Sequence, residues 1–187
     1  ESLPQETVSA IAENGRTITE RIQNGISFML SSDGQNTITQ MYDIQEARAL
    51  SDVARLFEEE AAKAVVPCHS DLIPGNYYLS ERHQPLFLDF DNVGGSMFPA
   101  DVDIGTVAHR IGVERSKDRS PEGLKRVFTE VIDGYNSAKN DEMTPSRLMR
   151  AMKLGICWKL SGSFAELAQG ISSYVGAEAK VRTFGSK

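Results

Sequence analysis

The feature that most constrains the fold is a change of hydrophobic period near the middle of the chain. Up to about Lys63, apolar residues recur at the three- and four-residue spacing of amphipathic helices. Between Ala64 and Phe90 they instead form three short runs rich in β-branched and aromatic residues, "AVVPC", "NYYLS" and "PLFLDF". Beyond Gly95 the helical period returns. The sequence therefore predicts a mostly α, α+β fold in which a helical body surrounds one small β-hairpin.

The helical parts of the chain divide into segments with recognisable ends. Pro4–Asn14 and Thr17–Leu30 are predicted as two helices with a stop at Gly15, followed by the turn-rich string "SSDGQN" as a loop. Ser120 and Thr144 have the side chains of helix N-caps. Further helices are predicted at about 44–63, 100–113, 121–138 and 145–169.

Composition narrows the class of protein. With 187 residues, 40% of them hydrophobic, the chain can bury one sizeable core, and a single domain over 1–187 is expected. The formal net charge of −6 disfavours nucleic acid and anionic lipid as partners and suits a small cationic substrate better. There is no apolar run near the roughly 18 residues that span a bilayer and no signal peptide. Cys68 and Cys157 fit packing thiols in a reducing compartment, so we expect a cytoplasmic protein.

Polar residues cluster at the outer ends of the predicted hairpin. Asp71 and Asn76 lie on the loop that enters it, and Asp89 ends the returning strand. Because a hairpin brings its outer ends side by side, Asn76 and Asp89 are expected to face the same point. Carboxylate and carboxamide oxygens suit Mg²⁺ holding the phosphates of a nucleotide. Asp71 would then accept the proton of a hydroxyl that attacks phosphorus.

The string "HSDLIPGN", followed by "LDFD", resembles the catalytic and metal-binding loops of the aminoglycoside phosphotransferase and choline kinase group. The shared pattern is His-x-Asp, four residues, Asn, and then an apolar strand that ends in Asp. Downstream, "ADVDIGTVAHRIG" is similar to the segment of that group in which an Asp-Ile or Asp-Leu pair opens a helix behind the active site. The match covers about Val66 to Gly112 and implies the helical C-terminal lobe of the protein-kinase-like fold.

The resemblance implies a role for each matching residue. Asp71 would be the catalytic base or the carboxylate that orients the substrate, and Asn76 and Asp89 would be Mg²⁺ ligands. His69 would brace the catalytic loop, and Asp103 would support it from a buried position.

Asp91 marks a departure from protein kinases. It stands where protein kinases have the glycine of Asp-Phe-Gly, and small-molecule kinases often carry a polar residue there. The short path from Asp91 to Asp103 also leaves little room for an activation loop. Both features favour a metabolite or antibiotic kinase. Asp91 itself is either a further metal contact or an exposed loop residue.

The late helices hold candidate substrate contacts. Choline-type kinases line the substrate pocket with aromatic side chains, which attract a quaternary ammonium through cation–π contact. The resemblance thus implies Trp158 and Tyr135 as substrate contacts and Glu166 as a countercharge. Core packing is the alternative for an aromatic residue at helical spacing.

The chain lacks the nucleotide clamp of such a kinase. No glycine-rich hairpin and no strand with a "VAIK"-like lysine precede His69. The chain also begins with Glu1. We therefore expect the C-terminal lobe of an ATP- or GTP-dependent kinase for a small, cationic alcohol, aminoglycoside- or choline-like, whose N-terminal lobe is absent from this chain and required in cis. A kinase-derived binding module without catalysis and a metal-dependent hydrolase remain as alternatives.

Overall fold

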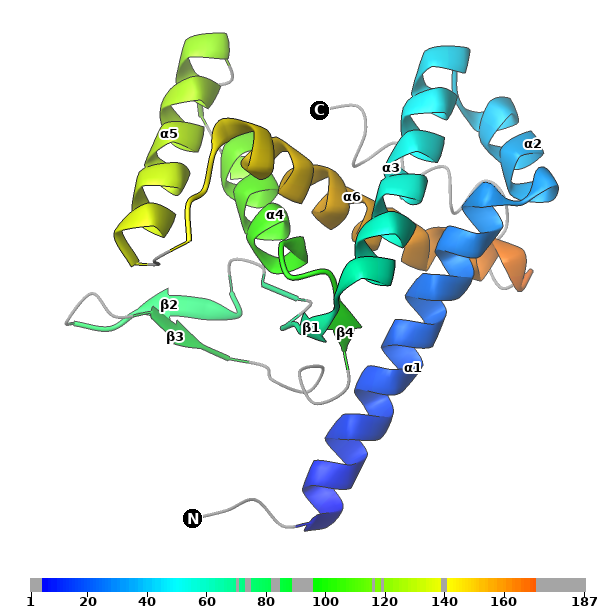
Figure 1. Ribbon diagram of the computed structural model, residues 1–187, viewed down its shortest axis with the longest axis horizontal. Helices are drawn as coiled ribbons and strands as arrows, with labels where there is room; N and C mark the ends of the chain where they lie inside the picture. Colours follow the sequence, from blue (N-terminus) through cyan, green and yellow to red (C-terminus); the bar gives the residue numbers. More distant parts are fainter. Residues whose placement is uncertain are drawn as a thin grey trace. The chain divides into compact units, whose positions relative to one another are not determined.

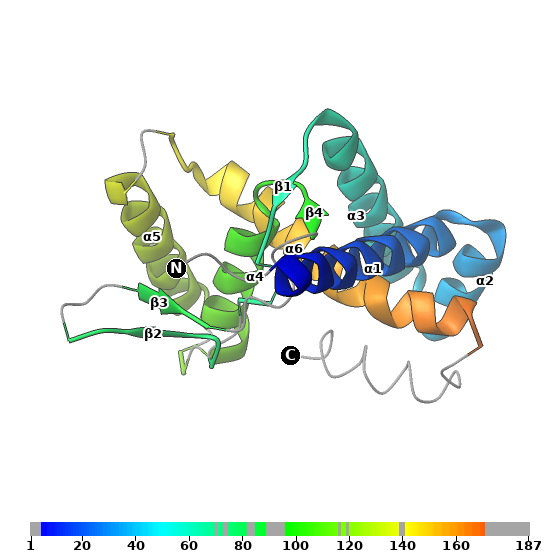
Figure 2. The same ribbon diagram turned by 90° about the horizontal axis from the view of Figure 1, so that it is seen from below.

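The computed structural model describes residues 5–69, 71–72, 75–81, 85–88, 96–115, 117–118, 120–138 and 141–170. Over these residues the chain is mostly helical, with a few short antiparallel strands (Figures 1 and 2). This confirms the mostly α prediction. The elements in chain order are α1(Gln5–Leu30), α2(Ser32–Met41), α3(Ile44–Lys63), β1(Val66–Pro67), β2(Tyr77–Leu79), β3(Pro85–Phe87), β4(Met97–Phe98), α4(Val102–His109), the π-helical turn η1(Arg110–Arg115), α5(Pro121–Ala138) and α6(Pro145–Ala168).

The described residues form two compact units. The first contains α1, α2, α3, β1, β4 and the part of α6 from Cys157 onward. The second contains β2, β3, α4, η1, α5 and α6 up to Ile156. A single domain over 1–187 stays a prediction.

The first unit opens with one continuous helix, so the predicted stop at Gly15 is wrong. A single glycine inside a helix costs about 1 kcal/mol, which a helix of this length tolerates. The hydroxyl of Thr17 donates to the carbonyl of Glu13 at 3.1 Å, across the turn that contains Gly15. The backbone around this glycine thus keeps the helical path.

The predicted loop at "SSDGQN" is also wrong, because most of it forms the start of α2. Ser31 is the N-cap of this helix, and its Oγ accepts a hydrogen bond from the N–H of Gly34 at 3.1 Å. Ile38 and Met41 lie on the buried face further along. Residues typical of turns are also the residues that cap helices.

Helix α3 has the predicted bounds and begins with a reciprocal cap. The carboxylate of Asp43 accepts from the N–H of Glu46 at 2.9 Å, and the carboxylate of Glu46 accepts from the N–H of Asp43 at 3.2 Å. Ala54 and Phe57 are buried on its inner face. This helix ends at Lys63, directly before β1.

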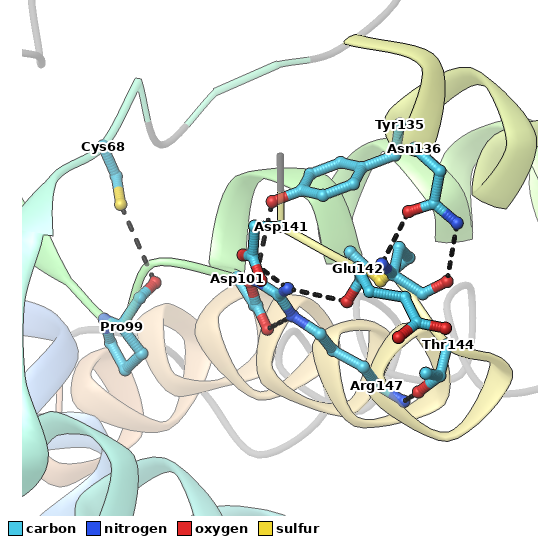
Figure 3. Close-up of polar contacts among 10 residues, drawn as sticks. Cys68, Pro99, Asp101, Tyr135, Asn136, Asp141, Glu142, Thr144 and Arg147 are labelled. Carbon is cyan, nitrogen blue, oxygen red and sulfur yellow. Dashed lines mark hydrogen bonds and ion pairs between the residues drawn. The ribbon is translucent and has the colours of Figure 1, made fainter. Parts of the chain in front are cut away.

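Strand β1, directly after α3, forms a strand pair with β4 that was not predicted from the sequence. Strand β1 pairs with β4 in an antiparallel register that places Val66 opposite Phe98. The N–H of Cys68 continues the pairing to the carbonyl of Ser96 at 2.9 Å. Its thiol points to the carbonyls of Phe98 and Pro99, at 3.8 and 3.9 Å (Figure 3 draws the contact with Pro99). The chain that leads into the candidate catalytic loop is therefore fixed by backbone pairing.

The core of the first unit lies between α1, α3, β4 and the end of α6. Phe98 packs edge-on against Phe57 and Trp158, with ring centroids 6.3 and 6.2 Å apart. Helix α1 runs beside α6 so closely that a Cβ on Gly25 would lie 1.9 Å from the carbonyl oxygen of Ser161 (Figure 2). Glycine is therefore required where these two helix backbones meet.

Both cysteines are buried thiols, as expected. Cys157 lies on α6, and its burial, together with the nearby charge of Glu58, raises the pKa of the thiol to about 12. The thiol is therefore protonated at neutral pH, which suits a packing role.

The second unit contains the predicted hairpin. Strands β2 and β3 pair antiparallel, with Tyr77 opposite Phe87 and Tyr78 opposite Leu86 (Figure 1). Helix α5 has the predicted bounds, and Ser120 caps it by accepting from the N–H of Gly123 at 3.0 Å.

The other two predicted helices differ from their expected bounds: α4 begins two residues late and ends at His109, and α6 ends one residue early, at Ala168. Helix α6 begins behind Thr144, whose hydroxyl accepts from the N–H of Arg147 at 3.2 Å, which confirms this cap. The helix predicted at about 100–113 begins at Val102 and widens into the π-helical turn η1.

Helices α4 and α6 meet through small residues. A Cβ on Gly105 would lie 1.8 Å from the carbonyl oxygen of Ala151, and a Cβ on Gly155 would lie 2.5 Å from the amide nitrogen of Thr106. Beside this contact, apolar side chains of α4, α5 and α6, together with Met143 just before α6, form the core of the second unit. It consists of Ala108, Met143, Leu148 and Met152, with Ile104, Phe128, Val131, Ile132 and Tyr135 packed against them.

Among the described helices, none has both the length and the apolar character needed to cross a membrane.

Candidate active site

The loop that enters the hairpin brings Asp71 and Asn76 together. Both side chains are partly buried. The carboxamide nitrogen Nδ2 of Asn76 donates to the backbone carbonyl of Asp71 and to its carboxylate oxygen Oδ2, each at 3.0 Å. Because Nδ2 faces Asp71, the carboxamide presents its oxygen, Oδ1, as the atom for another partner. The five-residue spacing seen in the sequence thus closes into one hydrogen-bonded turn.

Gly75 gives this turn its shape. Its φ of +135° is a backbone conformation that residues with a side chain rarely adopt. A Cβ at this position would meet no atom within 4 Å, so the requirement for glycine is conformational and not steric. The backbone conformation of Gly75 therefore sets the direction in which the chain continues into Asn76.

We expect Gly75→Ala to lower the free energy of unfolding by about 1–3 kcal/mol, because alanine strains the turn. If Asn76 is the Mg²⁺ ligand that the sequence predicts, the displaced carboxamide should also raise the KM for Mg-nucleotide. Gly170 is the matched control, since it also has a positive φ, +66°, and open space around it. Urea denaturation and steady-state kinetics of Gly75→Ala and Gly170→Ala measure both effects. Equal changes in KM for the two variants would contradict a specific role of Gly75.

The hairpin continues one residue beyond its paired strands toward this turn. The N–H of Leu88 donates to the carbonyl of Asn76 at 2.7 Å. The predicted approach of the returning strand to Asn76 is therefore present as far as Leu88. Asp89 is the next residue of the chain; it and Asp91 lie outside the described residues. Their roles as metal ligands stay predictions.

The two predicted supporting residues lie in different units. His69 is buried in the first unit, directly after Cys68. Asp103 is partly buried in the first turn of α4, in the second unit. Support of the catalytic loop by either residue stays a prediction.

Two of the predicted substrate contacts belong to the first unit and already have partners there. The ring of Trp158 packs edge-on against Phe98. The carboxylate of Glu166 forms an ion pair with Arg21 of α1. A substrate cation would have to compete with this guanidinium for Glu166.

Tyr135, the third predicted substrate contact, lies in the second unit beneath an arginine. The guanidinium carbon of Arg147 is 5.5 Å from the ring centroid of Tyr135. One face of the ring is thus occupied by a cation of the protein. Substrate binding by Tyr135, Trp158 and Glu166 stays a prediction.

The sequence patterns did not point to Arg147, which connects several segments of the second unit. It binds both carboxylate oxygens of Asp101, at 3.0 and 2.9 Å, and donates to the carboxylate of Asp141 at 2.6 Å and the carbonyl of Glu142 at 3.1 Å (Figure 3). The bonds to Asp101 and Asp141 raise the pKa of the guanidinium above its usual range. Arg147 and Asp101 are 46 residues apart, so no local pattern could have joined them.

The described residues contain no group of three histidine, cysteine, aspartate or glutamate side chains that could hold a metal ion. The metal site predicted from the sequence uses an asparagine and the undescribed Asp89. Hard oxygen donors are the type that Mg²⁺ prefers, and the carboxamide oxygen of Asn76 fits this requirement.

Comparison with protein-family models, with curated proteins and with solved structures gave no match to this chain. The case for a function therefore rests on the residues of the chain themselves.

Proposed function

We propose that this chain is the C-terminal, catalytic and substrate-binding lobe of a small-molecule kinase that resembles aminoglycoside phosphotransferases and choline kinases. It transfers the γ-phosphate of ATP or GTP to a hydroxyl of a small alcohol. The observation that carries the proposal is the hydrogen-bonded pair of Asp71 and Asn76, which lies where the chain enters an antiparallel hairpin. The mostly helical character of the described residues agrees with such a lobe.

Asp71 acts as the base. The Oδ2 atom of its carboxylate accepts a hydrogen bond from Asn76, which fixes the orientation of the group. The other oxygen, Oδ1, takes the proton of the substrate hydroxyl. The hydroxyl oxygen forms a bond to the γ-phosphorus, the bond from that phosphorus to the bridging oxygen breaks, and the nucleoside diphosphate leaves.

Asn76 and Asp89 hold the magnesium ion, with Asp91 as a further candidate ligand. Asn76 contributes Oδ1, because its nitrogen is engaged by Asp71. The bound ion supplies positive charge that offsets the charge of the phosphates. The pairing of Leu88 with the backbone of Asn76 supports this assignment, since Asp89 follows Leu88 directly.

In this proposal, His69 and Asp103 support the catalytic loop. An N-terminal lobe of the same polypeptide covers the phosphates of the nucleotide. The substrate is a small alcohol, and the formal net charge of −6 favours one with a positive charge.

The proposal is tested with the full-length protein, Mg-ATP or Mg-GTP, and a panel of alcohols that includes an aminoglycoside, choline and ethanolamine. We expect nucleoside diphosphate to form only when Mg²⁺ and an accepted alcohol are both present. Mass spectrometry should then show that the alcohol has gained one phosphate group. Phosphate release from a phosphomonoester without nucleotide would instead identify a hydrolase. Ligand binding without Mg²⁺, unchanged by Asp89→Ala, would identify a binding module.

A further inference from the structure

A partly buried ion pair lies at the start of α4. The side chains of Arg147 and Asp101 are 24% and 13% exposed, and the guanidinium grips both carboxylate oxygens through Nε and Nη2. A bidentate pair of this kind fixes direction as well as distance. Arg147 itself is held by Asp141, by the carbonyl of Glu142 and by the ring of Tyr135 (Figure 3). We call this contact between Arg147 and Asp101 the fork.

The fork replaces a helix cap. Asp101 occupies the N-cap position of α4, where an aspartate ordinarily accepts hydrogen bonds from the N–H groups of the first turn. Within the described turn its side chain makes no such bond. Its carbonyl still accepts from the N–H of Gly105 at 2.9 Å, so the turn is formed although the side chain of Asp101 points to Arg147.

We infer that Arg147 is a positioning residue for the phosphotransfer reaction. It acts through Asp101 on the first turn of α4, and that turn carries Asp103. This inference rests on the proposed function, in which Asp103 supports the catalytic loop. A lysine at position 147 keeps the charge but cannot bind both oxygens in a fixed plane. The turn would then open more often, and Asp103 would spend less time in place.

The test compares Arg147→Lys with Arg126→Lys in the full-length protein. Arg126 is the matched control, because it pairs with Asp118 in the same unit while both side chains are largely exposed, 64% and 49%. We expect Arg147→Lys to speed hydrogen exchange at the Gly105 amide and to lower kcat by roughly ten-fold, with the KM for Mg-nucleotide nearly unchanged. Arg126→Lys should change neither quantity.

Each outcome decides a separate point. Unchanged exchange in Arg147→Lys would show that the fork does not hold the turn and would overturn the inference. Faster exchange with an unchanged kcat would overturn the link from the turn to the reaction. A parallel rise in KM and fall in kcat would indicate general loss of structure and would also contradict a positioning role. If the wild type transfers no phosphate, the proposed function fails, and with it the link to the reaction, while the exchange data still decide whether the fork holds the turn.

Discussion

Replacing Asp71 by alanine is expected to lower kcat by about 10²- to 10⁴-fold, because Asp71 is the proposed base of the phosphotransfer reaction. The KM for Mg-nucleotide should remain nearly the same. Asn76 keeps its hydrogen bond to the backbone carbonyl of residue 71 when the carboxylate is removed, so the carboxamide stays in place. Steady-state kinetics with varied nucleotide separate the two parameters.

Three further variants sharpen this experiment. Asp71→Asn offers Asn76 a carbonyl oxygen in place of the carboxylate, so it tests the loss of the base without the loss of the hydrogen bond. Asp89→Ala should act mainly on KM for Mg-nucleotide. Asp133→Ala, an exposed carboxylate on α5, should change nothing. Equal and mild effects of Asp71→Ala and Asp89→Ala would contradict the assignment of roles.

A large loss of stability is expected for Gly105→Ala. The added Cβ would stand 1.8 Å from the carbonyl oxygen of Ala151, and this neighbour is backbone that cannot rotate away. Helices α4 and α6 would have to separate, at a cost of about 3 kcal/mol or more. Urea denaturation followed by circular dichroism measures the change.

Gly134→Ala is the matched control for this variant. Gly134 lies inside α5, and a Cβ there would meet no atom within 4 Å. Because alanine favours the helix more than glycine does, this change should raise the free energy of unfolding by up to about 1 kcal/mol. If Gly105→Ala were also stabilising, the close approach of α4 and α6 would be refuted.

The sequence predicted those parts of the fold that depend on neighbouring residues. The caps at Ser120 and Thr144 were predicted correctly because a cap is formed within one helical turn. The hairpin was predicted because the period of its apolar residues differs from that of a helix. The same reasoning failed at Ser31, since serine suits a turn and a cap equally well.

Contacts between distant segments could not be predicted. Strand β4 has two residues, Met97 and Phe98, which is too short to show a period. The need for glycine at Gly105 depends on the close approach of the α6 backbone, and the residues around Gly105 do not indicate that approach.

The candidate site shows the same division. Asp71 and Asn76 lie five residues apart and were both predicted as site residues, and the structure shows a hydrogen bond between them that the sequence did not predict. The fork between Asp101 and Arg147 joins distant segments and was not foreseen.

The packing of Trp158 against Phe98 also allows tryptophan fluorescence to follow one part of the molecule. Trp158 is the one tryptophan of the chain, and its ring belongs to the first unit. Its fluorescence therefore reports the packing of that unit, whereas circular dichroism sums the helices of both. If the two signals change at the same urea concentration, the units unfold as one cooperative system; if they separate, each unit has a stability of its own. The sequence thus carries a built-in optical probe of how far the two units depend on each other.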